Sequence, residues 1–235
     1  MSRGRGVLLI LVTIVVVGAV GVGLRYDATR TERDLSDASA EPFVSPVNGG
    51  PRAVFIGDSY VSGAGATDLG HRWSSLLSAK KLWTEDNIGI GGTGYALAAP
   101  GCGAERCGSF QEMADYAVTL NPPIVVVAGG NNDFEEFVRD PTDIVNAIYD
   151  TMGILRSGLP TARIIAVGPS AAAEVPPFVT IYEGVVRDAV NAVGGEFVSL
   201  TEPDVIEADM LAPDGVHVDD RGHAAIARAI DQALR

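Results

Sequence analysis

The chain has 235 residues, of which 47% are hydrophobic and 20% are charged, and its formal net charge is −13 at pH 7. This length suffices for one domain with a substantial core, and the composition excludes a wholly disordered chain. The excess of acidic residues argues against nucleic-acid binding, because contacts with phosphate groups need clusters of Lys and Arg.

The first element along the chain is an apolar segment. Val7–Leu24 contains no charged residue over 18 positions, with Arg3 and Arg5 before it and Arg25 after it. This run just reaches the length of a membrane-spanning helix and is long for a signal peptide, and no clear Ala-x-Ala cleavage site follows. We therefore expect residues 1–25 to form an uncleaved signal anchor, with a cleaved signal peptide as the alternative. The arginines that precede the run predict that the rest of the chain lies outside the cytoplasm, membrane-anchored or secreted.

Residues 26–50 are polar, mixed in charge and end in Pro and Gly, a composition typical of a flexible linker. We expect one folded domain over residues 51–235. It contains the two cysteines of the chain, Cys102 and Cys107. In an exported protein such a pair predicts a disulfide bond. A metal site is not expected there, because none of the three His residues lies nearby in the sequence.

From Pro51 onward, short apolar runs alternate with helical patterns. The runs suit strands buried on both faces, as in a parallel sheet, and cover residues 53–56, 124–128, 162–168 and 196–200, with a weaker run at 86–90. Helical spacing of apolar residues predicts helices over residues 72–82, 141–158 and 178–195, and from about residue 222. This alternation predicts a doubly wound or three-layer α/β domain.

Polar residues that follow the predicted strands are the candidates for a functional site, because ligands of such sheets bind beyond the carboxyl ends of the strands. The first strand is followed by Gly-Asp-Ser at residues 57–59, the second by a glycine-rich stretch at 89–94, and the third by Gly-Gly-Asn-Asn-Asp at 129–133. The segment before the last helix holds Asp214 and His217.

These residue types fit nucleophilic catalysis. A serine hydroxyl such as that of Ser59 is a weak nucleophile until a base takes its proton, and the base must be oriented by a third group. Asp214 lies three residues before His217 and can hold its imidazole. An acyl-transfer site also needs donors for the developing oxyanion, which the backbone of Gly92 and the amide of Asn132 could supply. Taken singly, each of these residues could instead be a helix cap, a turn or a surface residue.

The blocks together resemble the SGNH hydrolase family, also called the GDSL family. Its functional residues lie in ordered blocks that read G-D-S, a glycine block, G-x-N-D and D-x-x-H. The corresponding residues here stand in the same order: Gly57-Asp58-Ser59, Gly92, Gly130-Asn131-Asn132-Asp133 and Asp214-Gly215-Val216-His217. Each block is a weak signal alone, but all four occur in order, and the resemblance spans about residues 53–230.

The resemblance implies a three-layer α/β/α sandwich of the flavodoxin-like type, with a mainly parallel, about five-stranded central sheet. It also implies ester hydrolysis without a metal or other cofactor. Ser59 would be the nucleophile, His217 the base and Asp214 the residue that orients it. The oxyanion hole would consist of the backbone N–H groups of Ser59 and Gly92 and the side chain of Asn132.

The sequence departs from the family pattern at one position and is ambiguous at another. Tyr60 replaces the usual Leu of the GDSL signature, a change that we expect to affect packing or pocket shape rather than chemistry. Gly92 is assigned by its offset from Asn87, and Gly91 or Gly94 could be the donor instead. We expect His71 to be a surface residue and His223 to be part of the start of the last helix.

Three other functions use the same residues. Gly89-x-Gly91-x-x-Gly94 formally matches a dinucleotide fingerprint, but a helix should follow it, and the chain instead soon reaches Pro100-Gly101-Cys102. A non-catalytic surface binding protein on the same fold would have no need of the Ser, Asn, Asp and His residues. An acyltransferase would use the same acyl-enzyme with another acceptor.

The sequence therefore predicts an exported serine esterase. Its partners would be an ester substrate and, through the apolar segment, the membrane, with no nucleic acid. Because residues 51–235 contain no long apolar lid segment, we expect an open site for short acyl groups on glycans, lipids or small molecules.

Overall fold

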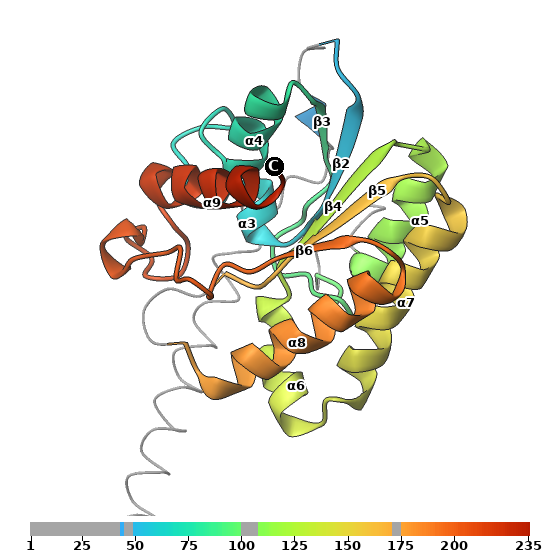
Figure 1. The fold of residues 1–235 in the computed structure, drawn as a ribbon. Helices are drawn as coiled ribbons and strands as arrows, with labels where there is room; N and C mark the ends of the chain where they lie inside the picture. Colours follow the sequence, from blue (N-terminus) through green and yellow to red (C-terminus); the bar gives the residue numbers. More distant parts are fainter. Residues whose placement is uncertain (1–42, 45–48, 100–107, 171–174) are drawn as a thin grey trace, which may run out of the picture.

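The computed structural model describes residues 43–44, 49–99, 108–170 and 175–235 (Figure 1). The predicted anchor at residues 1–25 and the predicted disulfide between Cys102 and Cys107 lie outside these residues. Within the described ranges, no helix combines the length and the apolar character needed to cross a membrane.

The centre of the domain is one sheet with the strand order β1-β3-β2-β4-β5-β6. The five strands from β2 to β6 pair in parallel, whereas the short edge strand β1 runs antiparallel to β3. This arrangement confirms the predicted α/β class with about five parallel strands. The strands are β1 (Phe43–Val44), β2 (Arg52–Gly57), β3 (Thr84–Asn87), β4 (Ile124–Ala128), β5 (Arg163–Val167) and β6 (Glu196–Val198).

Helices cover both faces of the sheet and make the three predicted layers (Figure 1). One face packs against α5 (Phe110–Leu120), α7 (Thr142–Gly158) and α8 (Pro177–Ala192), with α6 (Phe134–Arg139) against α7. The other face packs against α3 (Ser59–Ser62), α4 (Trp73–Lys81) and α9 (Asp220–Ala233).

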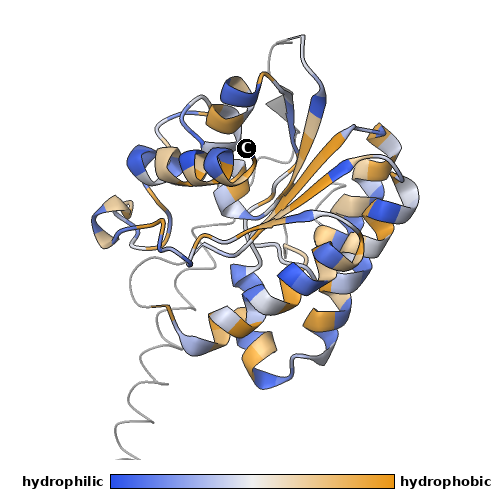
Figure 2. Cartoon of the chain, viewed as in Figure 1, coloured by the Kyte–Doolittle hydropathy of each residue, from blue (hydrophilic) through white to orange (hydrophobic). Residues whose placement is uncertain are grey.

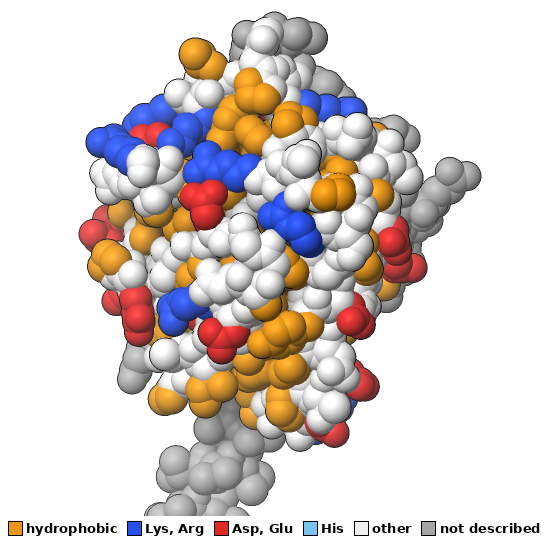
Figure 3. All heavy atoms as spheres, turned by 45° about the vertical axis from the view of Figure 1, so that its right-hand side comes forward, with side chains coloured by type: hydrophobic (Ala, Val, Ile, Leu, Met, Phe, Trp, Pro, Cys, Tyr) orange, Lys and Arg blue, Asp and Glu red, His pale blue; other side chains and the backbone are white. Residues whose placement is uncertain are grey.

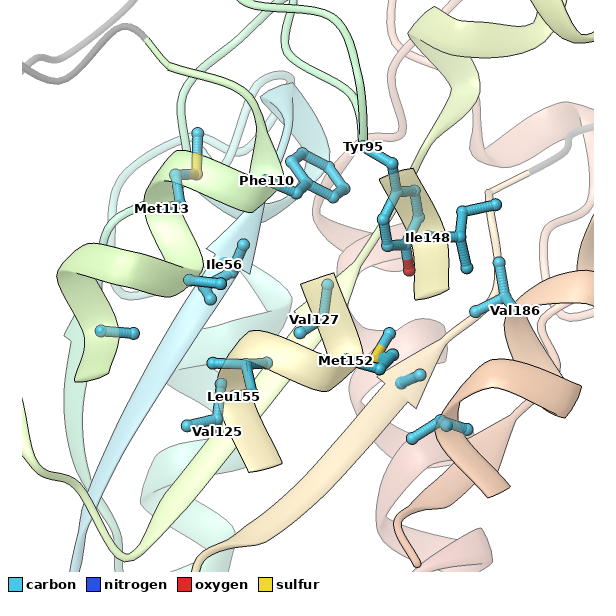
Figure 4. Packing of buried hydrophobic residues seen from close by; sticks show 14 of the residues in the cluster. Ile56, Tyr95, Phe110, Met113, Val125, Val127, Ile148, Met152, Leu155 and Val186 are labelled. Carbon is cyan, nitrogen blue, oxygen red and sulfur yellow. The ribbon is translucent and has the colours of Figure 1, made fainter. Parts of the chain in front are cut away.

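The core consists of apolar side chains from both faces of the strands. Successive residues of a strand point to opposite faces, and helices cover both faces, so nearly every strand residue is buried. Figure 2 shows hydrophobic strands in the centre and helices whose hydrophilic residues lie mostly on the outside. Figure 4 shows the larger cluster, where strand residues such as Ile56, Val125 and Val127 lie against helix residues such as Met152 and Leu155. All five are fully buried.

Charges on the surface are unevenly placed. On the face in Figure 3, Lys and Arg side chains gather toward the upper end, while Asp and Glu side chains lie mainly lower down and along the edges. Basic groups often have acidic partners: Lys80 and Lys81 contact Asp231 at 3.0 and 2.9 Å, and Arg163 contacts Glu196 at 2.6 Å. Of these, the pair of Arg163 and Glu196 is exposed on both sides, and exposed pairs contribute little to stability.

The structure differs from the sequence prediction at several elements. The strand expected at residues 86–90 is β3, which begins at Thr84 and ends at Asn87. Beyond this end, the backbone N–H groups of Ile88 and Ile90 still donate to the carbonyls of Phe55 and Gly57 in β2 at 3.0 and 2.9 Å. The helices α3, α5 and α6 were not predicted, and β1 lies within the predicted linker.

Candidate active site

The first part of the site is the turn between β2 and α3. Asp58 stands between the strand and the helix, and its carboxylate accepts the backbone N–H of Tyr60 at 3.0 Å. This cap begins a single helical turn that ends at Gly63. Ser59 is the first residue of that turn and is partly exposed, so its hydroxyl lies at the carboxyl end of the sheet.

The second part is the tight loop before α9. It is closed by an isolated bridge between Leu211 and Val218 and by a hydrogen bond from the N–H of Ala212 to the carbonyl of His217 at 2.8 Å. Inside the loop, Asp214 Oδ1 accepts the backbone N–H groups of Val216 and His217 at 2.8 and 3.0 Å. Asp214 therefore shapes the backbone of the loop as well as facing the imidazole.

These two parts meet through His217. Its Nε2 lies 2.9 Å from the hydroxyl oxygen of Ser59, and its Nδ1 lies 2.6 Å from Oδ2 of Asp214. A carboxylate can only accept, so Nδ1 carries the proton and Nε2 is free to accept the hydroxyl of Ser59. The imidazole is 3% exposed, whereas the Asp214 side chain is 47% exposed. The geometry is that of a nucleophile, a base and an orienting acid.

The charge on Asp214 is stabilised by its surroundings. Burial alone would raise the pKa of this carboxyl, but hydrogen bonds from the His217 ring and from two backbone N–H groups outweigh burial and lower the pKa below its ordinary value. A carboxylate that stays ionised can stabilise the imidazolium that forms when the base takes a proton.

The third part joins the loops after β3 and β4. The side-chain amide of Asn132 donates from Nδ2 to the carbonyl of Thr93 at 2.8 Å, which leaves its second N–H available. Thr93 in turn donates its hydroxyl to the carbonyl of Ile90 at 2.7 Å. The preceding residue, Gly92, is partly exposed and has a φ of 79°, a conformation that favours glycine. The predicted oxyanion donors Gly92 and Asn132 are thus connected by the hydrogen bond from Asn132 to Thr93, the residue after Gly92.

The other two glycines of this block fit the donor role less well. The N–H of Gly94 is already bonded to the carbonyl of Leu97 at 2.8 Å. A side chain at Gly94 would collide with the carboxylate of Asp133. Gly91 is buried, whereas Gly92 is not. The geometry favours Gly92 among the three.

Asp133 supports the loop that follows β3 through hydrogen bonds with its backbone. Its buried carboxylate accepts the backbone N–H of Tyr95 at 2.6 Å and that of Leu97 at 3.2 Å, and the hydroxyl of Tyr182 at 3.3 Å. Burial raises the pKa of Asp133, and these hydrogen bonds oppose the rise. The side chain thus supports the loop that contains Gly92 and Gly94.

Asp58 is a second buried carboxylate under the site. Besides the N–H of Tyr60, it accepts the N–H of Gly130 at 3.3 Å, so it links the ends of β2 and β4. Burial raises the pKa of Asp58 to about 6, against the opposing effect of these two hydrogen bonds.

The structure joins Ser59, His217 and Asp214 by direct contacts and joins Asn132 to Thr93, the neighbour of Gly92. The hydroxyl of Thr93 also lies 3.3 Å from the carbonyl of Gly57, at the end of the strand that precedes Ser59. The other two histidines lie elsewhere. His71 is exposed and contacts Asp68 at 2.9 Å. His223 is fully buried, accepts the N–H of Trp73 at 3.3 Å and donates to the carbonyl of Ala64 at 3.1 Å.

One contact in the site has no counterpart in the sequence prediction. The hydroxyl of Tyr60 donates to the carbonyl of Val216 at 2.5 Å, so it joins the neighbour of Ser59 to the neighbour of His217. The sequence showed only that Tyr60 departs from the family signature at this position.

The described residues contain no group of three or more His, Cys, Asp or Glu side chains that could hold a metal ion.

Comparisons with known proteins point the same way as the geometry. The sequence model of the GDSL-like Lipase/Acylhydrolase family matches residues 55–225. The GDSL lipase Rv0518 of Mycobacterium tuberculosis is 28% identical over 189 residues, which cover 77% of this chain and 79% of that protein.

Solved structures share the fold at low sequence identity. TesA superposes with a TM-score of 0.61 at 18% identity, over 78% of this chain and 98% of TesA. A carbohydrate acetylesterase family member from Sinorhizobium meliloti superposes with a TM-score of 0.60 at 19% identity, over 78% of this chain and 97% of that one. At these identities the likeness shows the three-layer fold.

Proposed function

The chain belongs to the GDSL-like lipase/acylhydrolase family, and on that premise we propose that it hydrolyses carboxylic esters through an acyl-enzyme on Ser59. The observation that carries the proposal is the unbroken chain of contacts from Ser59 Oγ to His217 Nε2 at 2.9 Å and from His217 Nδ1 to Asp214 at 2.6 Å.

The reaction would proceed in two halves. In the first, His217 takes the hydroxyl proton while the oxygen of Ser59 attacks the ester carbonyl carbon, and the resulting tetrahedral intermediate expels the alcohol, which receives the proton from His217. In the second, a water molecule loses a proton to His217 and attacks the acyl carbon; the bond to the Ser59 oxygen then breaks, the oxygen takes the proton back from His217, and the carboxylic acid is released. Asp214 keeps the imidazole in the tautomer that both halves need.

The negative oxygen of each tetrahedral intermediate needs donors that are already in place. We assign this role to the backbone N–H groups of Ser59 and Gly92 and to the second N–H of the Asn132 amide. The first N–H of that amide is fixed by the carbonyl of Thr93, so the amide is oriented before the substrate arrives. A preorganised donor spends no energy on reorientation during the reaction.

For the substrate we propose short acyl groups on glycans, lipids or small molecules. Support comes from the absence of a long apolar lid segment in the sequence and from the name of the Sinorhizobium neighbour, a carbohydrate acetylesterase family member. We further propose that the enzyme acts outside the cytoplasm and is held at the membrane by residues 1–25, on the evidence of their sequence.

A panel of 4-nitrophenyl esters of increasing acyl length tests this function, with Ser59→Ala as the blank. We expect turnover of acetate and butyrate that Ser59→Ala abolishes, and a decline toward long chains. Repeating the assay with an added alcohol shows whether the acyl group goes to water or to another acceptor. Equal turnover by the wild type and by Ser59→Ala would contradict the proposal.

A further inference from the structure

We propose that Tyr60 is a positioning residue, whose hydroxyl holds the His217 loop in register with Ser59. This inference rests on the proposed function, because it concerns how the same two residues are kept together. It arises from the hydrogen bond between the Tyr60 hydroxyl and the Val216 carbonyl, at 2.5 Å.

The two halves of the site need such a tie because they come from opposite ends of the chain. Ser59 and His217 are 158 residues apart, and their side chains meet across a single hydrogen bond of 2.9 Å. Proton transfer from a hydroxyl to an imidazole requires hydrogen-bond distance and alignment, and a displacement of about 1 Å can cost about 100-fold in rate.

Tyr60 and Val216 are placed to control that displacement. Each is the immediate neighbour of one of the two reacting residues, so the hydrogen bond between them joins the same two segments as the one between Ser59 and His217. The tyrosine is itself fixed, because the residue is 6% exposed and its backbone N–H is bonded to Asp58 at 3.0 Å. It can therefore act as a rigid support.

Val216, in the loop that contains His217, is bonded through both its N–H and its carbonyl. The N–H of Val216 is bonded to Asp214 at 2.8 Å, and its carbonyl is bonded to Tyr60. The rings of Tyr60 and His217 also contact each other, with centroids 5.6 Å apart and planes inclined at 50°. Asp214 fixes the shape of the loop, and Tyr60 fixes the position of the loop against α3.

The hydroxyl is the part of Tyr60 that this role requires. A Leu, which the family name places after Gly-Asp-Ser, can fill apolar space but cannot donate a hydrogen bond. Loss of a buried hydrogen bond typically changes an energy by an amount equivalent to about a 10-fold change in rate. The effect should fall on kcat, because this hydrogen bond positions the two reacting groups against each other.

The test is Tyr60→Phe, which keeps the ring and removes only the hydroxyl. We expect kcat to fall by about 10-fold with KM changed by less than twofold, while circular dichroism shows a folded protein. Tyr149→Phe is the matched control, because Tyr149 is 43% exposed on α7 and should leave kcat unchanged. A kcat within twofold of wild type, or a rise in KM alone, would overturn the proposal.

A second measurement separates this inference from the proposed function. In protein with 15N-labelled histidine, the ring resonances of His217, assigned by comparison with His217→Gln, report how firmly the imidazole is held without any turnover. We expect them to shift or broaden in Tyr60→Phe and not in Tyr149→Phe. Unchanged His217 resonances would overturn the positioning role, whereas a wild type that hydrolyses no ester would refute only the function. If Tyr60→Phe folds poorly, Tyr60→Leu serves in its place, because Leu is the residue in the family name. We expect Tyr60→Leu to show the same fall in kcat and the same shift or broadening of the His217 resonances.

Discussion

The carboxyl ends of β2 and β4 share one arrangement of a buried aspartate and an accessible polar neighbour. Each is followed by an aspartate that is 1% exposed and by a neighbouring polar residue that is not buried: Asp58 beside Ser59, and Asp133 beside Asn132. In both cases the carboxylate points inward and accepts backbone N–H groups. The adjacent side chain is left at the surface, where a substrate can reach it.

The two ends differ in what the inward carboxylate holds. Asp58 accepts from Tyr60 and Gly130 and so links two neighbouring strand ends. Asp133 accepts from the loop that follows β3 and from the hydroxyl of Tyr182. We therefore expect the outward residues to govern turnover and the inward residues to govern stability, each through its own contacts.

The largest effect should come from the outward residue at β2. Ser59→Ala removes the nucleophile and should lower kcat by roughly 10⁴–10⁶-fold, the range known for such residues in other serine hydrolases. The fold should survive, because Asp58 caps the helix whichever residue follows it. Labelling with a serine-directed phosphonate, followed by mass spectrometry, checks the assignment. Label found on another serine of the variant would move the nucleophile elsewhere.

The outward residue at β4 should give the next largest effect. Asn132 gains most from an oxygen that carries a full charge, as in the tetrahedral intermediate, and little from a neutral ester. Asn132→Ala should therefore lower kcat by roughly 10²–10³-fold, or about 3–4 kcal/mol, with little change in KM. Steady-state kinetics on the folded variant measure this. If kcat stays near normal, Asn132 is not an oxyanion donor.

These outward residues could be predicted from the sequence because each lies in a short local block after a predicted strand. The strands themselves were evident because runs such as Ile124–Ala128 are apolar throughout. The Tyr60–Val216 hydrogen bond could not be predicted, since it joins residues 156 positions apart and nothing local indicates the partner. The helix α5 was missed although its Ser109–Glu112 capping box stands in the sequence.

The inward residue at β4 should affect stability first. Asp133→Ala leaves the N–H groups of Tyr95 and Leu97 and the hydroxyl of Tyr182 without their acceptor, and buried donors of this kind cost about 1–3 kcal/mol each when unpaired. We expect the free energy of unfolding to fall by about 3 kcal/mol in urea denaturation. Asp115→Ala, at an exposed position of α5, is the control and should change it by less than about 0.5 kcal/mol. Equal stability of the two variants would contradict the supporting role of Asp133.

The inward residue at β2 should reveal itself through pH. Burial raises the pKa of Asp58 to about 6 in the folded protein, whereas an unfolded chain has the ordinary value of 3.8. Between these values the folded state binds more protons than the unfolded state, so the stability that Asp58 contributes is fully present below about pH 4 and is lost as the pH rises through 6. The difference between a pKa of 3.8 and one of about 6 corresponds to roughly 2–3 kcal/mol.

Asp58→Asn isolates this contribution, because an amide does not titrate. The variant pays a constant cost for its imperfect match to the N–H groups of Tyr60 and Gly130, so only the change with pH is informative. Relative to the wild type, its free energy of unfolding should rise by roughly 2–3 kcal/mol between pH 4 and pH 7.5, measured by urea denaturation at both values. Asp140→Asn is the matched control, because hydrogen bonds with Thr142 lower the pKa of the exposed Asp140, so the sign of its contribution is reversed. A difference between wild type and Asp58→Asn that stays constant over this range would mean that Asp58 titrates as it does in the unfolded chain. Burial would then raise the pKa of Asp133 but not that of Asp58, and the two strand ends would differ in how burial acts on their carboxyl groups.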